Sequence, residues 1–371
     1  MICGQLRPVF KLTESCNLAC KYCYQEGKLD SGYFMDEATL TKALTEVAQN
    51  TKGTMHLLWF GGEPTLYGVK RFAKAMELVD SIFAGRTVYH GIQTNGTLIN
   101  SEWASLLAER KFAVTVSLDG PQWLHDAQRP HRPCASCAGA GSFEEVMRGI
   151  SNLRAVGINP RVSAVLTPEA MLHPEELVNW YEAQGFKEMD FVPSTRYHKG
   201  GFEVEVNGHQ FKEFIMRVLE RWLALNNPNF KVRLLSETAR KLAGHAPHYC
   251  KLEGRCSHFV GFGWNGDVYP CDEFSGIKEF CLGNIHQNSL EELMTSEKAI
   301  EFFRRWAQIP PSCSKCKWFH FCRGGCAWER QLSGDPENPT VMCEAMYAIM
   351  ERLSREIPDS AERWKAVEKA D

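Results

Sequence analysis

The sequence predicts an α/β fold in which a parallel sheet with helical crossovers precedes a smaller, cysteine-rich domain. Strand-like and helix-like segments alternate through the first half of the chain, with six strand-like segments before residue 194. Glycine-containing motifs follow several of these strands, and cysteines return at high density after residue 250. The alternation alone fits either a partial barrel or a doubly wound sheet. In a barrel, functional groups lie at the carboxyl ends of the strands.

The predicted elements follow from the spacing of the apolar residues. Short apolar runs predict strands at 7–13, 54–60, 87–94, 112–118, 160–167 and 187–193. Amphipathic segments predict helices at 36–48, 69–83, 101–110, 143–157 and 174–185, then a long helix at 209–226 and a last one at 343–357. We therefore expect an α/β domain over 1–199, a helical bridging region over 200–249, a cysteine-rich domain over 250–345, and a C-terminal helix and tail over 346–371.

Composition and charge narrow the class of protein. The chain has 371 residues and a formal net charge of −3, which gives no electrostatic reason to expect a nucleic acid or an anionic membrane as partner. It has no run of 18 apolar residues and no signal-peptide pattern, so a cytoplasmic location is expected. Fifteen cysteines, an odd number, argue against a disulfide scaffold and favour metal ligands or catalytic groups.

Three of these cysteines crowd the loop after the first predicted strand. Cys16, Cys20 and Cys23 follow the spacing C-x3-C-x2-C. A structural zinc site takes four protein ligands, and a 4Fe–4S cluster likewise offers four corners. Three thiols on one short loop therefore leave one position open for a ligand that is not protein. The alternatives are incidental cysteines or part of a zinc site.

Further motifs follow the next strands. Gly61, Gly62, Glu63 and Pro64 form a GGEP motif, in which the glycines allow close backbone approach and Glu63 with nearby backbone groups could hold an ammonium. The segments QTNG at 93–96 and SLDG at 117–120 end two later strands. Taken alone, both are ordinary turn sequences. Their position at successive strand ends favours a functional interpretation.

The three motifs together resemble those of the radical S-adenosylmethionine (SAM) enzymes, which implies a partial (β/α)6 TIM-like barrel. In that family three cysteines hold a 4Fe–4S cluster whose open iron binds SAM, and reductive cleavage of SAM gives a 5′-deoxyadenosyl radical that takes a hydrogen atom from the substrate. The resemblance implies that Cys16, Cys20 and Cys23 hold this cluster. The cofactor-binding residues it implies are Tyr22, Gly61, Gly62, Glu63, Pro64, Asn95, Ser117 and Asp119, with Gln93 also in the active site.

The C-terminal cysteines resemble those of the SPASM domain, a family of auxiliary-cluster domains. The spacings are C-x9-G-x4-C from Cys256 to Cys271 and C-x2-C-x5-C-x3-C from Cys313 to Cys326. The resemblance implies two more 4Fe–4S clusters with interleaved ligands: Cys250, Cys256, Cys271 and Cys326 for one, and Cys313, Cys316, Cys322 and Cys343 for the other. The alternative is a double zinc ribbon, because CSKC at 313–316 alone would fit one. The four remaining cysteines are Cys3, Cys134, Cys137 and Cys281.

Two residues are candidates for the chemical step beyond the radical. Asp272 follows Cys271 at the position that, in anaerobic sulfatase-maturating enzymes, carries the proposed catalytic base, although this motif is widespread in SPASM domains. Tyr24, next to Cys23, is either a second active-site residue or a packing aromatic. The resemblance implies a peptide- or protein-modifying enzyme that oxidises a side chain to formylglycine or crosslinks a precursor peptide. Only about six residues precede the first predicted strand, which favours a compact design of the maturase kind.

Several alternatives remain open at this level. The enzyme could be a crosslinking maturase of ribosomally made peptides or a small-molecule radical enzyme, and a non-catalytic zinc or cluster scaffold is a different class. The expected partners are a peptide or protein substrate and an electron donor such as a flavodoxin or a ferredoxin, with neither nucleic acid nor membrane. The pair Cys134 and Cys137 could bind zinc, take part in redox chemistry, or do neither.

Overall fold

The computed structural model describes residues 6–25, 31–132, 139–194, 205–253, 256–335 and 337–357. The chain divides into two compact units, each drawn from segments that are distant in sequence. Unit 1 comprises Met1–Leu118, His125–Arg161 and Ser257–Arg304, and unit 2 comprises Asp119–Leu124, Val162–Cys256 and Arg305–Asp371. These are structural groupings, so the sequence limits expected for the four segments remain predictions.

Unit 1 is built on seven strands whose order is β10-β9-β8-β1-β2-β3-β4. Strands β8, β1, β2, β3 and β4 run parallel, and β9 and β10 add an antiparallel edge. The bounds are β1 Arg7–Lys11, β2 Met55–Phe60, β3 Val88–Thr94, β4 Ala113–Ser117, β8 Phe259–Phe262, β9 Asp267–Tyr269 and β10 Gly283–Asn284.

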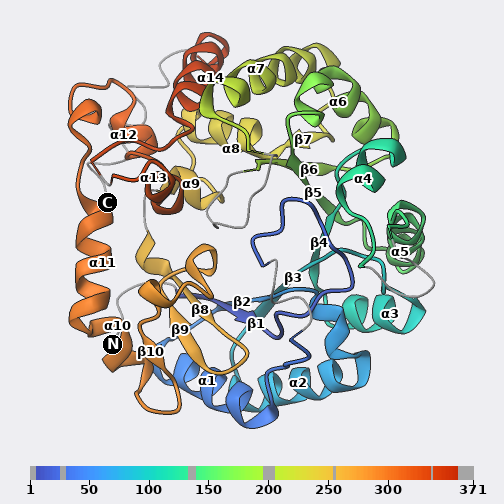
Figure 1. Ribbon diagram of the computed structural model, residues 1–371, viewed down its shortest axis with the longest axis vertical. Helices are drawn as coiled ribbons and strands as arrows, with labels where there is room; N and C mark the ends of the chain where they lie inside the picture. The colour runs from blue at the N-terminus through green and yellow to red at the C-terminus, as the bar shows by residue number, and fades with distance from the viewer. Residues whose placement is uncertain are drawn as a thin grey trace. The chain divides into compact units, whose positions relative to one another are not determined.

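Helices cover one face of this sheet, as the predicted crossovers require. Helices α1, α2 and α3 lie along the strands on one side (Figure 1). The helices and 3₁₀ turns that begin in this unit are α1 Glu37–Asn50, η1 Pro64–Tyr67, α2 Val69–Ile82, α3 Ser101–Glu109, α5 Phe143–Ala155, η4 Asp272–Phe274, η5 Lys278–Phe280, α10 Leu290–Thr295 and α11 Glu297–Ala307. Two more elements, α4 Gln122–Gln128 and η3 Cys256–His258, begin in unit 2 and end in unit 1.

The core of unit 1 is a row of aromatic rings on the helix side of the sheet. Phe10 stacks between Trp59 and Phe262, with both centroid distances at 5.2 Å, so the row runs across β2, β1 and β8. Phe72 of α2 meets Trp59 edge-on at 5.4 Å. Burial of such rings is the largest favourable contribution that a side chain makes to folding. The row includes a residue from the cysteine-rich half of the chain, so that half is not organised around metal alone.

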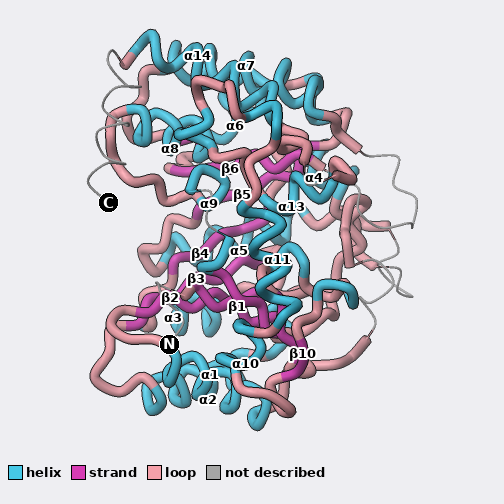
Figure 2. The backbone as a smooth tube through the Cα atoms, turned by 90° about the vertical axis from the view of Figure 1, so that its left-hand side faces the viewer, coloured by secondary structure: helices cyan, strands magenta, loops and turns pink. Residues whose placement is uncertain are grey.

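Unit 2 carries three strands and the remaining helices. Strand β6 pairs in parallel with both β5 and β7. Helix α7 packs against α6 and α14, and α14 also packs against α8 (Figures 1 and 2). The bounds are β5 Arg161–Leu166, η2 Ala170–Leu172, α6 Pro174–Ala183, β6 Glu188–Pro193, α7 Gly208–Leu225, β7 Lys231–Val232, α8 Arg233–Leu242, α9 Cys250–Glu253, η6 Pro311–Cys313, α12 Phe319–Cys322, α13 Ala327–Leu332 and α14 Cys343–Glu356.

The strands and helices predicted in the first half match observed elements closely, whereas the short helices α4, α9, α12 and α13 were not predicted. Helices α8, α10 and α11 were not predicted, although α10 begins with a capping box between Ser289 and Glu292 that the sequence displays. The most consequential difference is the parallel pairing of β8 with β1, which places Gly261 opposite Val9. No described helix combines the length and apolar composition needed to cross a membrane.

Candidate active site

The cysteine loop begins directly after β1, at the carboxyl end of the strand. Cys16, Cys20 and Cys23 lie half-buried on this loop. Thr13 anchors its start, because its hydroxyl accepts a hydrogen bond from the Ser15 amide (3.0 Å) and donates one to the Tyr33 carbonyl (2.6 Å). Burial, reinforced by the nearby Glu63 carboxylate, raises the pKa of Cys16 to about 12. A thiolate at this position therefore requires compensation by a cation such as iron.

The two glycines of the GGEP motif lie against this loop. The Gly62 amide donates to the Thr13 carbonyl over 2.7 Å, and the Glu63 amide donates to the Ser15 carbonyl over 2.8 Å. A Cβ atom on Gly61 would lie 2.4 Å from the Thr13 oxygen, and one on Gly62 would lie 2.2 Å from the Ser15 oxygen. The described contact of both glycines is thus with the cysteine loop itself, where a side chain has no room.

Glu63 ties the ends of β2 and β3 together from a fully buried position. One carboxylate oxygen accepts hydrogen bonds from the Thr65 amide (2.9 Å) and from the hydroxyls of Thr65 (2.5 Å) and Thr94 (2.7 Å). The other oxygen accepts from the Asn95 amide at 2.6 Å. Burial raises the pKa of Glu63, and these four donors oppose the shift. The carboxylate retains acceptor capacity for an ammonium, because a carboxylate offers about four lone-pair sites and Oε2 uses one.

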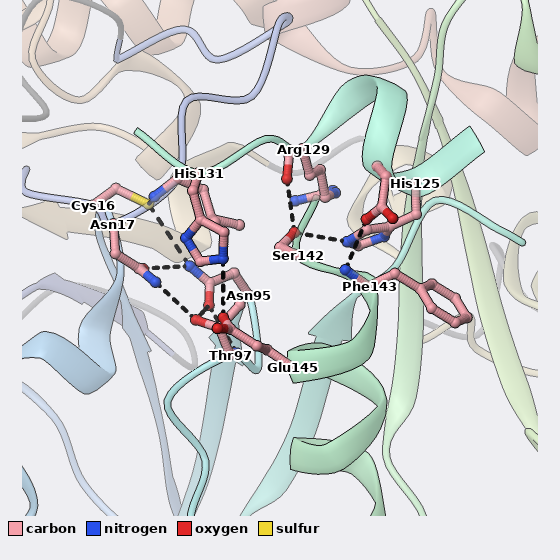
Figure 3. A network of polar contacts seen from close by, with 12 residues as sticks. Cys16, Asn17, Asn95, Thr97, His125, Arg129, His131, Ser142, Phe143 and Glu145 are labelled. Carbon is pink, nitrogen blue, oxygen red and sulfur yellow. Dashed lines mark hydrogen bonds and ion pairs between the residues drawn. The ribbon is translucent and has the colours of Figure 1, made fainter. Parts of the chain in front are cut away.

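A polar network links Cys16 to the turn after β3 (Figure 3). The side-chain Nδ2 of Asn95 donates to Asn17 Oδ1 at 2.9 Å and lies 3.7 Å from the sulfur of Cys16. Asn17 in turn donates to the Thr97 hydroxyl, which donates to Asn95 Oδ1, at 2.8 and 2.7 Å. Asn95 therefore positions the first cysteine. Its predicted contact with a cofactor is a separate expectation that the network neither requires nor blocks.

The segment 128–132 holds the other side of the cysteine loop. Backbone bonds join Ala19 to Pro130 (2.9 Å) and Lys21 to Gln128 (3.0 Å). The Arg129 guanidinium lies 3.9 Å from the Cys20 sulfur and 5.3 Å from the centre of the Tyr22 ring. Figure 3 shows this segment beside Cys16, with His131 paired to Glu145 at 3.0 Å. The sequence analysis did not single out Arg129, and a lone arginine in a loop carries no signal that would have identified it.

The other residues assigned to the SAM site are placed less directly. Gln93 of β3 is paired with Thr115 of β4, and Ser117, which ends β4, is buried in the same unit. Pro64 follows Glu63 in the sequence, begins η1 and is buried. Asp119 belongs to unit 2, where its carboxylate accepts a hydrogen bond from the Val165 amide at 2.9 Å. Its predicted contact with the cofactor stays a prediction.

A second cluster of polar groups in unit 1 joins Tyr24 to Asp272. The ammonium of Lys11, the last residue of β1, donates to the Tyr24 hydroxyl at 3.1 Å. Burial lowers the pKa of Lys11, and the negative groups of Asp272, Glu273, Cys271 and Glu14 oppose this. Burial also raises the pKa of Tyr24 well above its usual value, with further increases from Glu273 and Asp272. The structure therefore brings together two residues that the sequence analysis had proposed, through a lysine that it had missed.

One predicted set of auxiliary cysteines gathers in unit 2. Cys313 and Cys316 share a turn in which the Cys316 amide donates to the Cys313 carbonyl at 3.0 Å, and Cys343 begins α14. Burial, together with the nearby Cys322, Cys313 and Cys316, raises the pKa of Cys343 to about 11. Four sulfur atoms grouped in this way suit a ligand that takes all of them as thiolates.

The other predicted set is divided between the units. Burial raises the pKa of Cys326 well above its usual value, and Cys250 and Cys256 are close enough to contribute. Cys271 lies in unit 1, so its place in this set remains a prediction. Cys281 is a free cysteine in unit 1 whose sulfur lies 3.5 Å from the Gly283 carbonyl. Cys3, Cys134 and Cys137 lie outside the described residues.

The donor sets fit iron–sulfur clusters. Among the described residues, no three His, Cys, Asp or Glu side chains lie close enough to hold one metal ion. In a 4Fe–4S cluster each thiolate binds a different iron, so its ligands are all sulfur and are spread around the cluster. The three-cysteine loop, enclosed by glycines on one side and Arg129 on the other, provides this chemistry with one position left over.

The fold and the cysteines together define an α/β protein that binds iron–sulfur clusters. Comparison with known families agrees, because residues 10–181 match the radical SAM superfamily and residues 250–317 match SPASM, described as an iron–sulfur cluster-binding domain. The chain therefore contains a radical SAM domain and a SPASM domain, as its motifs predicted.

Similar proteins are known along nearly the whole chain. A serine-type anaerobic sulfatase-maturating enzyme of Bacteroides thetaiotaomicron is 28% identical over 91% of this chain and 87% of its own length. A cysteine-type anaerobic sulfatase-maturating enzyme of Clostridium perfringens is 28% identical over 85% of this chain and 86% of its own. The solved structure of native anSMEcpe with bound AdoMet and the Cp18Cys peptide has a TM-score of 0.85 at 25% identity, covering 99% of this chain and 100% of that one. The predicted fold class is confirmed.

Proposed function

We propose that this chain is a sulfatase-maturating type of radical SAM enzyme, which oxidises a Cys or Ser side chain of a peptide or protein to formylglycine. The two curated relatives described above carry out sulfatase maturation, and the similar solved structure contains a peptide. The observation that carries the proposal is the Lys11, Tyr24 and Asp272 cluster, which lies in the same compact unit as the cysteine loop.

We assign the cofactors to the residues that fit them. Cys16, Cys20 and Cys23 would hold the cluster that binds SAM, and residues 61–64 with Asn95, Ser117 and Asp119 would contact SAM. The eight SPASM cysteines would hold two auxiliary 4Fe–4S clusters. Together these cofactors supply one-electron chemistry that removes a hydrogen atom from an unactivated carbon.

The protein's own groups would complete the oxidation. Converting a CH₂–OH side chain to the aldehyde, or a CH₂–SH side chain to the thioaldehyde, removes two electrons and two protons. A hydrogen atom from the carbon would go to the 5′-deoxyadenosyl radical, one proton leaves the oxygen or sulfur atom, and one electron is left for an oxidised cluster to accept. With Cys, water would then replace the sulfur and release hydrogen sulfide. Asp272 would accept the proton that leaves the oxygen or sulfur atom, because the residue is half-buried, begins η4, and lies within electrostatic range of Tyr24. Gln93 would line the substrate side of β3, in register with Thr115.

The partners follow from this chemistry. We infer that a low-potential one-electron donor, such as a flavodoxin or a ferredoxin, reduces the clusters. We place the enzyme in the cytoplasm, where thiols are kept reduced. A peptide of the substrate protein, presented in extended form, would carry the target Cys or Ser.

The test is direct conversion of peptide. The anaerobically reconstituted chain, with SAM and a chemical reductant, is given matched peptides that span a sulfatase maturation site and carry Cys, Ser or Ala at the modified position. We expect an aldehyde, detected by mass spectrometry and a hydrazide probe, from the Cys or the Ser peptide and none from the Ala peptide. A crosslinked product, or 5′-deoxyadenosine without any peptide change, would refute formylglycine formation.

A further inference from the structure

Lys11 occupies a position that lysine seldom takes. It is the last residue of β1, in register with Phe60 of β2, and only 3% of its surface is exposed. Lysine is almost never this buried unless its ammonium is paired, because removing the charge from water costs several kcal/mol. We therefore expect polar or charged groups near the ammonium that offset its loss of hydration.

The first of these groups is Tyr24. The Lys11 ammonium lies 3.1 Å from the Tyr24 oxygen, 5.0 Å from the centre of the Tyr24 ring and 5.7 Å from the centre of the Phe60 ring. Tyr24 still exposes 39% of its surface. The ammonium therefore fixes a buried hydroxyl on a tyrosine whose side chain remains partly exposed to solvent.

The second group is the turn that carries Asp272. Because β8 pairs in parallel with β1, Gly261 lies opposite Val9, two residues before Lys11. A Cβ on Gly261 would lie 2.7 Å from the Ser275 hydroxyl and 3.6 Å from the Asp272 Cα, so the missing side chain lets the turn η4 pack directly on β8. This packing brings the carboxylates of Asp272 and Glu273 within electrostatic range of Lys11.

We infer that Lys11 is a positioning residue for the proposed reaction: its buried ammonium fixes the Tyr24 hydroxyl and attracts the Asp272 carboxylate, and so sets how both meet the substrate side chain. The inference rests on the proposed function. It assigns Lys11 no contact with substrate and no role in binding iron. It also gives β1 a role beyond carrying the cysteine loop, because the last residue of this strand then orients Tyr24 and Asp272.

The test measures how tightly SAM cleavage is coupled to peptide modification, as the ratio of modified peptide to 5′-deoxyadenosine. A purely structural residue would not change this ratio. Lys11→Met removes the charge and the donor at similar length, and Lys74→Met on the exposed face of α2 is the matched control. We expect Lys11→Met to lower the ratio of modified peptide to 5′-deoxyadenosine at least tenfold. Its iron content and the change in its cluster EPR signal on adding SAM should match those of the wild type. Lys74→Met should keep the wild-type ratio.

Tyr24→Phe is an independent test of the role of the hydroxyl, because it removes the hydroxyl and keeps the ring. We expect it to lower the ratio in the same direction, and we expect the double variant to lose no more than the worse single variant. If Lys11→Met fails to retain iron, Tyr24→Phe alone decides. Wild-type coupling in Tyr24→Phe, or multiplied losses in the double variant, would overturn the inference.

The two hypotheses fail in different ways. A wild-type chain that releases 5′-deoxyadenosine yet converts no sulfatase peptide refutes the proposed function and the inference with it. If the wild type modifies the peptide and Lys11→Met has the same ratio of modified peptide to 5′-deoxyadenosine, only the inference about Lys11 is refuted.

Discussion

The backbone amide of Glu63 donates a hydrogen bond of 2.8 Å to the carbonyl oxygen of Ser15. This bond and its neighbour, from Gly62 to Thr13, join the turn after β2 to the cysteine loop after β1. The GGEP motif therefore shapes the loop that carries the three cysteines before any cofactor is considered. The glycines are needed because the two backbones touch.

Gly62→Ala tests this contact. The new Cβ would lie 2.2 Å from the Ser15 oxygen, a backbone atom that cannot move without displacing the loop. We expect a loss of about 1–3 kcal/mol in stability and a loss of iron from the cluster of this loop. The control is Gly53→Ala, where nothing lies within 4 Å and only the positive φ of 69° is strained. Iron quantification and thermal unfolding give the result, and normal iron in Gly62→Ala would contradict the packing argument.

The lowered pKa of His90 predicts that the stability of unit 1 depends on pH. Burial lowers its pKa to about 4 from 6.5, and its Nδ1 accepts a hydrogen bond from the Trp59 indole at 3.2 Å. The unfolded chain therefore binds a proton at this residue before the folded chain does, so stability falls as the pH drops below about 6.5. From pH 7 to pH 5 we expect a loss of about 2 kcal/mol from this group.

His90→Asn keeps an acceptor near the indole and removes the titration. Urea unfolding at both pH values, followed by tryptophan fluorescence, compares the two proteins. The variant should lose about 2 kcal/mol less than the wild type on acidification. Equal losses would show that His90 is charged, or exposed, in the folded protein.

We expect the buried Lys241 to stabilise two of the segments that carry the auxiliary-cluster cysteines. It is buried in α8, and its ammonium donates to the carbonyl of Leu252 at 2.6 Å and to that of Phe321. It thus joins the segment of Cys250 to the segment of Cys322. We expect Lys241→Met to cost about 1–3 kcal/mol for each carbonyl left without its donor and to reduce the auxiliary iron, whereas Lys231→Met on the exposed side of β7 should not. Full iron content in Lys241→Met would be inconsistent with this role.

Asp272→Asn tests the proposed base. The amide keeps the size of the carboxylate but cannot accept the substrate proton, so peptide conversion should fall by about 10²-fold or more while 5′-deoxyadenosine formation continues. Glu279→Gln, at an exposed position of η5, is the matched control. Parallel assays of both products decide the question. If Asp272→Asn reduced the two products equally, the residue would act before proton transfer.

The sequence was most informative where local rules determine the structure. The helices of the first half follow from the spacing of their apolar residues, and Asp36, the first residue of one predicted helix, caps α1 through a hydrogen bond from the Thr39 amide. The spacing of the cysteines carries the family resemblance, and that resemblance implies which of them are cluster ligands. These features depend on neighbours along the chain, so the residues themselves display them.

The sequence was least informative where distant segments meet. Nothing in the run FVGF at 259–262 indicates that it pairs with β1, because a short apolar strand fits the edge of any sheet. Lys11 was therefore read as an ordinary strand residue, and its relation to Tyr24 and Asp272 was not foreseen. Arg129 was missed for the same reason, since its contacts with Cys20 and Tyr22 arise only from the fold.

The central claim is that the loop of Cys16, Cys20 and Cys23 holds a cluster whose remaining iron binds SAM. The measurement that tests it most directly is EPR of the dithionite-reduced protein with and without SAM, in the wild type and in a variant with all three cysteines replaced by alanine. We predict a signal that shifts on adding SAM in the wild type. In the variant that response should vanish, and about four of ~12 irons should be lost while the auxiliary clusters remain. A SAM-dependent shift that survives in the variant would contradict the claim.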